Sequence, residues 1–144
     1  MKGLVYEEYA PDDDFKKILK VKDVDDPKPK PDEVVFKVKA AALNFNDIWG
    51  MRGQPVPVPL PHISGSDAAG EVIAVGDEVT KIKVGDRVMS HSNMSCRVCS
   101  ACTDGREFDC EKRTIWGFQT GPNWGAYSEI THLPEVNIVK LPDN

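Results

Sequence analysis

Several features are scarce or absent in this chain of 144 residues, and each absence excludes a class of protein. No apolar run approaches the roughly 18 to 20 residues that a membrane-spanning helix needs. The first ten residues, MKGLVYEEYA, lack the apolar segment of a signal peptide. Basic residues do not predominate, because the formal net charge is −5, and a nucleic-acid-binding face is normally basic. We therefore expect a cytoplasmic protein that binds neither membranes nor nucleic acids.

Long stretches of helical periodicity are also lacking. Short apolar or alternating segments recur instead, separated by proline, glycine and acidic turns. The exception is NFNDIWGMRG, for which we predict one or two helical turns that begin at Asn44 and end at Gly53. The whole pattern predicts a mainly β fold, a barrel or sandwich with short helices. Strands are expected within residues 2–9, 15–24, 33–43, 68–76, 77–89, 125–133 and 137–141.

Cysteine is confined to one stretch, SCRVCSACTDGREFDC, with the spacing C-x2-C-x2-C-x7-C. Four thiolates this close in sequence can surround one Zn²⁺ ion tetrahedrally, and four protein ligands leave no position for a substrate. The surrounding lobe has few apolar residues, so a bound metal would stabilise its fold. A structural zinc site is therefore predicted at Cys96, Cys99, Cys102 and Cys110.

Two other uses of these cysteines remain open. Four cysteines allow three disulfide pairings, although no secretory signal points to an oxidising compartment. An iron–sulfur cluster is the second, since C-x2-C-x2-C resembles half of a ferredoxin motif, but the following C-x3-C-P element is missing. Zinc is the favoured occupant of the three.

The cysteine lobe, at about residues 91–113, resembles the structural-zinc lobe of the medium-chain dehydrogenase/reductases, the zinc alcohol dehydrogenase superfamily. The stretch GSDAAGEVIAVGDEVTKIKVGDRV is similar to the central signature of that superfamily. The ending NIVKLPDN resembles the point where its N-terminal domain meets its cofactor domain. The resemblance implies that residues 1–144 form the GroES-like β-barrel of a catalytic domain.

The cofactor-binding half that this resemblance implies is not in the sequence, because no G-x-G-x-x-G occurs. We therefore expect a Rossmann domain after residue 144 of a longer polypeptide. The fragment alone is expected to be inactive, since it cannot hold the dinucleotide. The complete protein is expected to be a homo-oligomer, by analogy with the family.

The chain departs from the alcohol dehydrogenase pattern at the ligands of the catalytic zinc. Asn44 stands at the position of the cysteine ligand, and Ser66 stands at the histidine of the G-H-E motif. Asparagine and serine are poor zinc ligands, and Asp67 alone cannot hold the ion. The three histidines do not occupy the positions of the family's ligands; they are His62, His91 and His132. No catalytic zinc is expected, which leaves reduction of an activated C=C bond with NADPH, as in the quinone and enoyl reductases of the superfamily.

Two segments indicate which subgroup of the superfamily the chain resembles most. NFNDIW and TIWGFQTGPNWGAYSEI resemble segments of crotonyl-CoA reductase/carboxylases and acrylyl-CoA reductases that line the active site near the nicotinamide. The resemblance places Asn44, Asn46, Phe118 and Gln119 in the site and implies a small acyl-CoA substrate. An asparagine amide could donate to the thioester oxygen, where hydride addition builds enolate charge. Gln119 replaces a glutamate, so simple reduction is expected rather than reductive carboxylation.

Other interpretations compete with this one. A zinc-dependent alcohol dehydrogenase or a quinone oxidoreductase is the alternative enzyme, and a non-enzymatic barrel that uses its zinc lobe for protein contacts is the alternative class. Asn44 could serve only as a helix cap, and Phe118 could belong to the core. His62 is expected in a loop, and Tyr127 is expected on a strand, packing rather than donating a proton.

Overall fold

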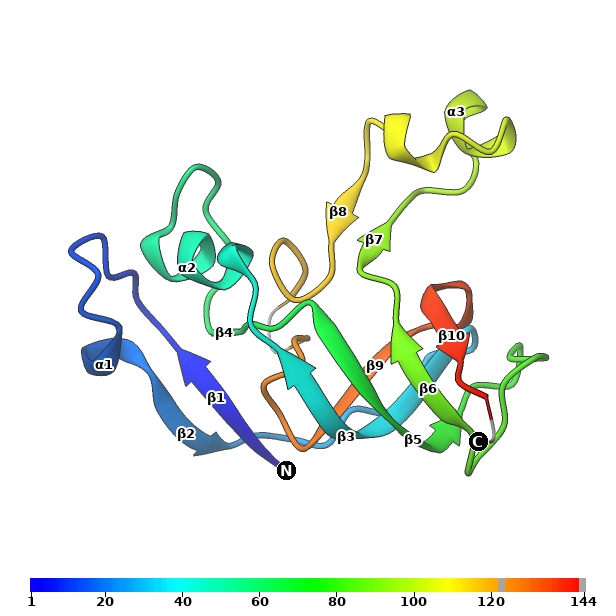
Figure 1. Ribbon diagram of the computed structural model, residues 1–144, viewed down its shortest axis with the longest axis horizontal. Helices are drawn as coiled ribbons and strands as arrows, with labels where there is room; N and C mark the ends of the chain where they lie inside the picture. The colour runs from blue at the N-terminus through cyan, green and yellow to red at the C-terminus, as the bar shows by residue number, and fades with distance from the viewer. Residues whose placement is uncertain (122–123, 143–144) are drawn as a thin grey trace.

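A computed structural model describes residues 1–121 and 124–142 of the chain. Three antiparallel sheets dominate it, which confirms the mainly β prediction (Figure 1). The central sheet has the strand order β10-β6-β5-β3-β9, and a smaller sheet has the order β2-β1-β4. The central strands are β3 (Glu33–Ala42), β5 (Asp67–Val75), β6 (Arg87–Ser90), β9 (Ile130–Pro134) and β10 (Ile138–Lys140). The smaller sheet contains β1 (Lys2–Tyr6), β2 (Lys20–Asp23) and β4 (His62–Ile63).

The third sheet pairs β7 (Asn93–Met94) with β8 (Thr114–Ile115), and the cysteine lobe lies beyond it, projecting from the barrel (Figure 1). The described helices are few and short, as the sequence predicts. They are α1 (Phe15–Ile18), α2 (Phe45–Arg52), α3 (Ser100–Thr103) and the 3-10 turns Glu107–Asp109 and Glu135–Asn137. No helix in the described ranges has the length and apolarity needed to cross a membrane.

The segment at residues 15–24 differs from the single strand expected there. It begins with the helical turn α1 and only then continues as β2. Phe15, Ile18 and Leu19 stand at the i, i+3, i+4 spacing of a helical face, and all three pack into one core cluster. The alternation of apolar and charged residues that indicates a strand begins only at Leu19.

Two apolar clusters form the core. The first lies against the central sheet and includes Val34, Phe36 and the fully buried Trp116. The second lies between the smaller sheet and α2, and it includes Tyr6 and Phe118. Phe118 thus belongs to the core, the simpler of its two interpretations.

Close strand packing explains the glycine within β5. A Cβ atom built on Gly70 would lie 2.1 Å from the backbone oxygen of Lys37 on the neighbouring β3. No side chain fits there, so the ladder between β3 and β5 requires glycine at this position.

His62 corrects an expectation. It lies in β4 rather than in a loop, and it is fully buried. Its Nδ1 is 3.1 Å from the carbonyl oxygen of Pro59, and its Nε2 is 3.1 Å from that of Gly117. The proline-rich run before it suggested a loop, but the run ends where β4 pairs with β1.

Candidate metal centre and candidate active site

The four cysteines converge at the tip of the lobe. Their sulfur atoms all lie within 4.8 Å of one another. The Sγ atoms of Cys99 and Cys102 are 3.5 Å apart, and those of Cys96 and Cys102 are 4.0 Å apart. A tetrahedral ion with Zn–S bonds of about 2.3 Å requires sulfur separations of about 3.8 Å. The spacing therefore fits a single zinc ion, and it is too wide for disulfides, whose sulfurs lie about 2.05 Å apart.

Backbone amides favour the thiolate form of Cys96, one of the four cysteines. Hydrogen bonds from the backbone of Val98, and then of Cys99, lower the pKa of the Cys96 thiol to about 6. The amide of Cys96 donates in turn to Sγ of Cys110 at 3.4 Å. Donors aimed at sulfur are what a cluster of metal-bound thiolates needs, because they offset its negative charge. The backbone alone supplies these hydrogen bonds to sulfur.

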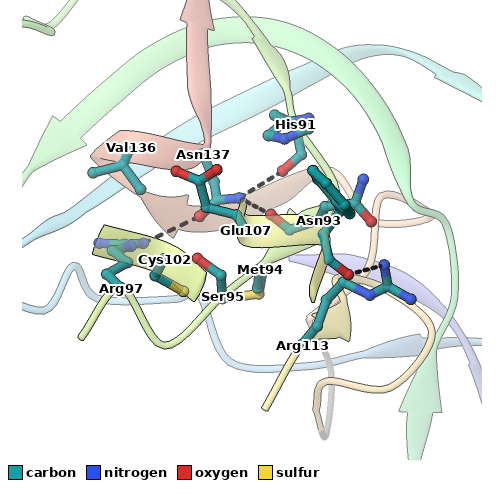
Figure 2. A pocket seen from close by; sticks show the side chains of 11 residues that line it. His91, Asn93, Met94, Ser95, Arg97, Cys102, Glu107, Arg113, Val136 and Asn137 are labelled. Atoms are coloured by element: carbon teal, nitrogen blue, oxygen red, sulfur yellow. Dashed lines mark hydrogen bonds between the residues drawn. The ribbon is translucent and has the colours of Figure 1, made fainter. Parts of the chain in front are cut away.

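A buried asparagine joins the lobe to the barrel. Asn137 donates from Nδ2 to the backbone oxygens of His91 and Asn93, both at 2.8 Å. Its Oδ1 accepts from Nη2 of Arg97 at 3.1 Å, and Arg97 stands between two of the cysteines. Figure 2 shows these three hydrogen bonds converging on Asn137 in a cavity of about 680 Å³ at the base of the lobe. The side chain of Asn137 therefore connects Arg97 of the lobe to the end of β6 and to β7.

The proposed catalytic segments meet at the start of α2. Asn44 is the N-cap of the helix, since its side chain accepts from the backbone N–H of Asn46 at 3.1 Å. Nδ2 of Asn44 contacts Oδ2 of Asp67 at 3.5 Å, so the segments at residues 44 and 65–67 are adjacent. Ser66 is buried, and its Oγ has no hydrogen-bond partner among the described residues. This place in the fold offers an amide, a hydroxyl and a carboxylate.

Asp47, which the sequence analysis did not single out, is the hub of this region. It is buried, and its Oδ1 accepts from the backbone N–H of Gly65 at 3.0 Å. Its Oδ2 accepts from the backbone N–H of Asn44 at 2.8 Å and from the hydroxyl of Tyr127 at 2.6 Å. The spacing N-x-x-D of a capping box could have revealed the contact between Asp47 and the backbone of Asn44. Nothing in the sequence indicated that Tyr127 contacts Asp47.

Tyr127 corrects the expectation of a strand, because it lies outside the named strands, and its hydroxyl donates a hydrogen bond to Asp47. The same hydroxyl is 3.1 Å from the backbone oxygen of Ala42 at the end of β3. Burial, and then the hydrogen bond to Asp47, raise the pKa of Tyr127 above its ordinary value. Tyr127 therefore stays protonated at neutral pH and links β3 to α2.

The other predicted site residues lie nearby but are not gathered with Asn44. Asn46 is half-buried in the first turn of α2. The buried Phe118 packs beside Trp49, with ring centroids 6.5 Å apart. Gln119 accepts from the backbone N–H of Ile115 at 3.0 Å through Oε1, which closes the loop that carries Phe118. Asn44 lines a cavity of about 420 Å³ that none of these three touches.

Comparisons with known proteins agree with this architecture. Residues 30–143 match the family model described as the alcohol dehydrogenase GroES-like domain. An alcohol dehydrogenase of Geobacillus stearothermophilus is 36% identical over 132 residues, which are 90% of this chain and 38% of that protein. The chain therefore spans less than two fifths of the length of this relative.

Two solved structures carry the comparison further. An NAD-dependent alcohol dehydrogenase superposes with a TM-score of 0.89 at 36% identity, covering 100% of this chain and 40% of that one. A crotonyl-CoA carboxylase/reductase superposes with a TM-score of 0.85 at 27% identity, covering 96% of this chain and 33% of that one. The match spans the β-barrel and the cysteine lobe together, and this chain therefore belongs to the alcohol dehydrogenase GroES-like domain family of the medium-chain dehydrogenase/reductases.

Proposed function

We propose that this chain, residues 1–144, is the catalytic domain of an NADPH-dependent oxidoreductase that reduces the C=C bond of a short enoyl-CoA without a catalytic zinc. A cofactor-binding domain elsewhere in the complete protein would hold most of the NADPH. The observation that carries this proposal is the adjacency of Asn44 and Asp67, together with the burial of Ser66, which precedes Asp67 in the chain. These segments stand where the resemblance places zinc ligands, yet they offer neither thiolate nor imidazole. Among the described residues, the four cysteines form the one metal-binding cluster.

The chemistry of this site fits conjugate reduction. Hydride addition to the β-carbon of an enoyl thioester moves negative charge onto the carbonyl oxygen, and a fixed N–H donor there stabilises the transition state. Nδ2 of Asn44 is such a donor, since capping by Oδ1 fixes the orientation of the amide. NADPH supplies the hydride when bound. Phe118 packs in the core cluster that contacts α2, and in this proposal it helps to exclude water from that side of the helix.

Gln119 favours simple reduction of the substrate over reductive carboxylation. Its Oε1 is engaged by the backbone of Ile115. A neutral amide holding a turn cannot organise a charged network for CO₂ capture as a carboxylate could. The enolate is therefore protonated rather than carboxylated.

The cysteine lobe holds one structural zinc in this proposal. The sulfur separations fit that ion, and the four ligands leave no open position for a substrate. The metal then contributes to folding and takes no part in hydride transfer.

The test is an assay of NADPH oxidation by the complete protein with crotonyl-CoA and acrylyl-CoA. Asn44→Ser keeps a good N-cap but removes the amide donor, so it separates the two roles of this residue. We expect kcat/KM to fall about a hundredfold, the effect of losing one donor to a developing oxyanion, with little change in the unfolding midpoint. Turnover with alcohols or quinones but with no enoyl-CoA would overturn the proposal.

A zinc-dependent alcohol dehydrogenase is the second candidate. The observation that favours it is the 36% identity to alcohol dehydrogenases, which exceeds the 27% identity to the crotonyl-CoA carboxylase/reductase. Metal analysis of the complete protein separates the two candidates. One zinc per chain supports the enoyl reductase, whereas two zinc ions with activity towards alcohols would support the alcohol dehydrogenase.

A further inference from the structure

One face of α2 lines a cavity of about 420 Å³, which we call the α2 cavity. The helix contributes Asn44 at its cap, then Asp47, Ile48 and Met51, at the i, i+3, i+4, i+7 spacing of a single face. Phe45, in the first turn of α2, also lines the cavity. The facing walls come from β1, from the segments after α1 and β3, and from two further segments at residues 64 and 127. They are formed by Leu4, Tyr6, Leu19, Leu43, Ser64 and Tyr127. Its volume lies within the roughly 300 to 1,000 Å³ typical of small-molecule sites.

The polar groups of the α2 cavity are already paired with one another. The hydroxyl of Tyr6 lies 3.3 Å from Oγ of Ser64, and the hydroxyl of Tyr127 donates to Asp47. A polar ligand would therefore find few partners deep in the cavity and would lose its hydration without compensation. An aliphatic chain meets no such cost.

Asn44 is the exception in this lining. Its Nδ2 group carries two hydrogens and makes one long contact, 3.5 Å, to Asp67. Beside it, the side chains of Leu43 and Phe45 are 88% and 58% exposed. A cavity with apolar walls, one available amide donor and exposed apolar side chains next to that donor fits a ligand with an aliphatic tail and a carbonyl head.

We propose that the α2 cavity binds the acyl chain of the thioester substrate while Asn44 binds its carbonyl, so that chains longer than crotonyl are preferred. This inference rests on the proposed function and shifts the preferred substrate from short enoyl thioesters to those with a longer acyl chain. The larger cavity at the base of the lobe is a poorer match, because Arg97, Glu107 and Arg113 line it.

The first test is a chain-length series on the complete protein with crotonyl-CoA, hexenoyl-CoA and octenoyl-CoA. Burial of each additional methylene is expected to raise kcat/KM about fourfold. Leu19→Phe fills the cavity from a half-buried wall position. It should abolish the gain in kcat/KM of octenoyl-CoA over crotonyl-CoA, which is read as the ratio of the two values within the variant. Val139→Phe, at a 49% exposed position on β10 outside the cavity, is the control and should leave the whole series unchanged.

The second test needs no turnover. S-octanoyl-pantetheine has no C=C bond to reduce, and its binding to the complete protein is measured by calorimetry. Tighter binding than S-butanoyl-pantetheine, lost in Leu19→Phe and kept in Val139→Phe, supports the cavity assignment even if no enoyl-CoA is reduced. Equal binding of the two thioesters, or a flat chain-length series with active enzyme, would overturn the assignment and leave the proposed function standing.

Discussion

At the scale of single residues, the buried carboxylate of Asp47 determines the shape of the candidate site. A buried charge is tolerated only where hydrogen bonds replace its hydration. Asp47 receives three, from Gly65, Asn44 and Tyr127, and each donor belongs to a different segment of the chain. The same bonds that solvate the carboxylate therefore fix the cap of α2 against the turn before β5 and against the segment that carries Tyr127.

This arrangement predicts unequal effects of two substitutions. Asp47→Ala leaves the backbone N–H groups of Gly65 and Asn44 without an acceptor and removes the shorter hydrogen bond of Tyr127, so it should lower the free energy of unfolding by about 3 kcal/mol or more. Tyr127→Phe removes one hydroxyl and leaves two donors on Asp47, so its cost should be about 1 kcal/mol. Urea unfolding of both variants measures the difference. The interpretation of Asp47 as a hub is wrong if Asp47→Ala costs no more than Tyr127→Phe.

At the scale of elements, β3 and β9 are joined by more than their ladder. Glu33 at the start of β3 accepts from Nδ1 of His132 on β9 at 3.0 Å, and from the backbone N–H and Nζ of Lys30 at 3.1 and 3.2 Å. The ring of Trp124 lies edge-on to the ring of His132. Nζ of Lys30 lies 4.5 Å from the centroid of the Trp124 ring. Burial opposes the charge of Glu33, but these hydrogen bonds prevail and lower its pKa below 4.5.

A definite dependence on pH follows from the direction of this shift. A carboxyl with a lower pKa in the folded state binds fewer protons than in the unfolded chain, so it stabilises the fold above pH 4.5. That contribution is lost as the pH falls through the folded pKa. Glu33→Gln should therefore be less stable than the parent at pH 7 and should lose less stability between pH 5 and pH 3. Chemical unfolding at several pH values checks this, and parallel pH profiles would contradict it.

The individual elements were more predictable than their arrangement. Apolar alternation indicated the strands, and the Asn44 and Gly53 boundaries of α2 could be predicted because helix caps depend on residues that are close in sequence. The cysteine cluster could be predicted for the same reason, since its four residues span fifteen positions. The α2 cavity could not be predicted, because Leu4, Ser64 and Tyr127 meet there only through long-range pairing of the chain. The loop predicted at His62 was wrong because the burial of a residue depends on which strand pairs with its segment, and this pairing is long-range.

At the scale of the whole molecule, the lobe and the barrel are stabilised in different ways. The barrel has two apolar clusters, and the described residues of the lobe contribute Met94 at the edge of one of them. The tip of the lobe, in contrast, buries Cys102 and Cys110, while Val98 and Phe108 are 80% and 66% exposed. The cysteines that are predicted to bind metal therefore replace an apolar core at the tip, and Asn137 joins the base of the lobe to the barrel.

Metal removal should separate these two parts. Chelation of the predicted zinc leaves four thiols without a common ligand, so the tip should lose its fold while the barrel, whose clusters lie elsewhere, keeps its own. Hydrogen exchange should then become fast at residues 96–110 and remain slow in β3 and β5. Cys102→Ser should reproduce this pattern together with loss of bound zinc, whereas Ser100→Ala, at an exposed position of the same helical turn, should retain the metal. Loss of protection in β3 on chelation would mean that the metal supports the whole fold, because the barrel strands exchange slowly only while their own core is intact.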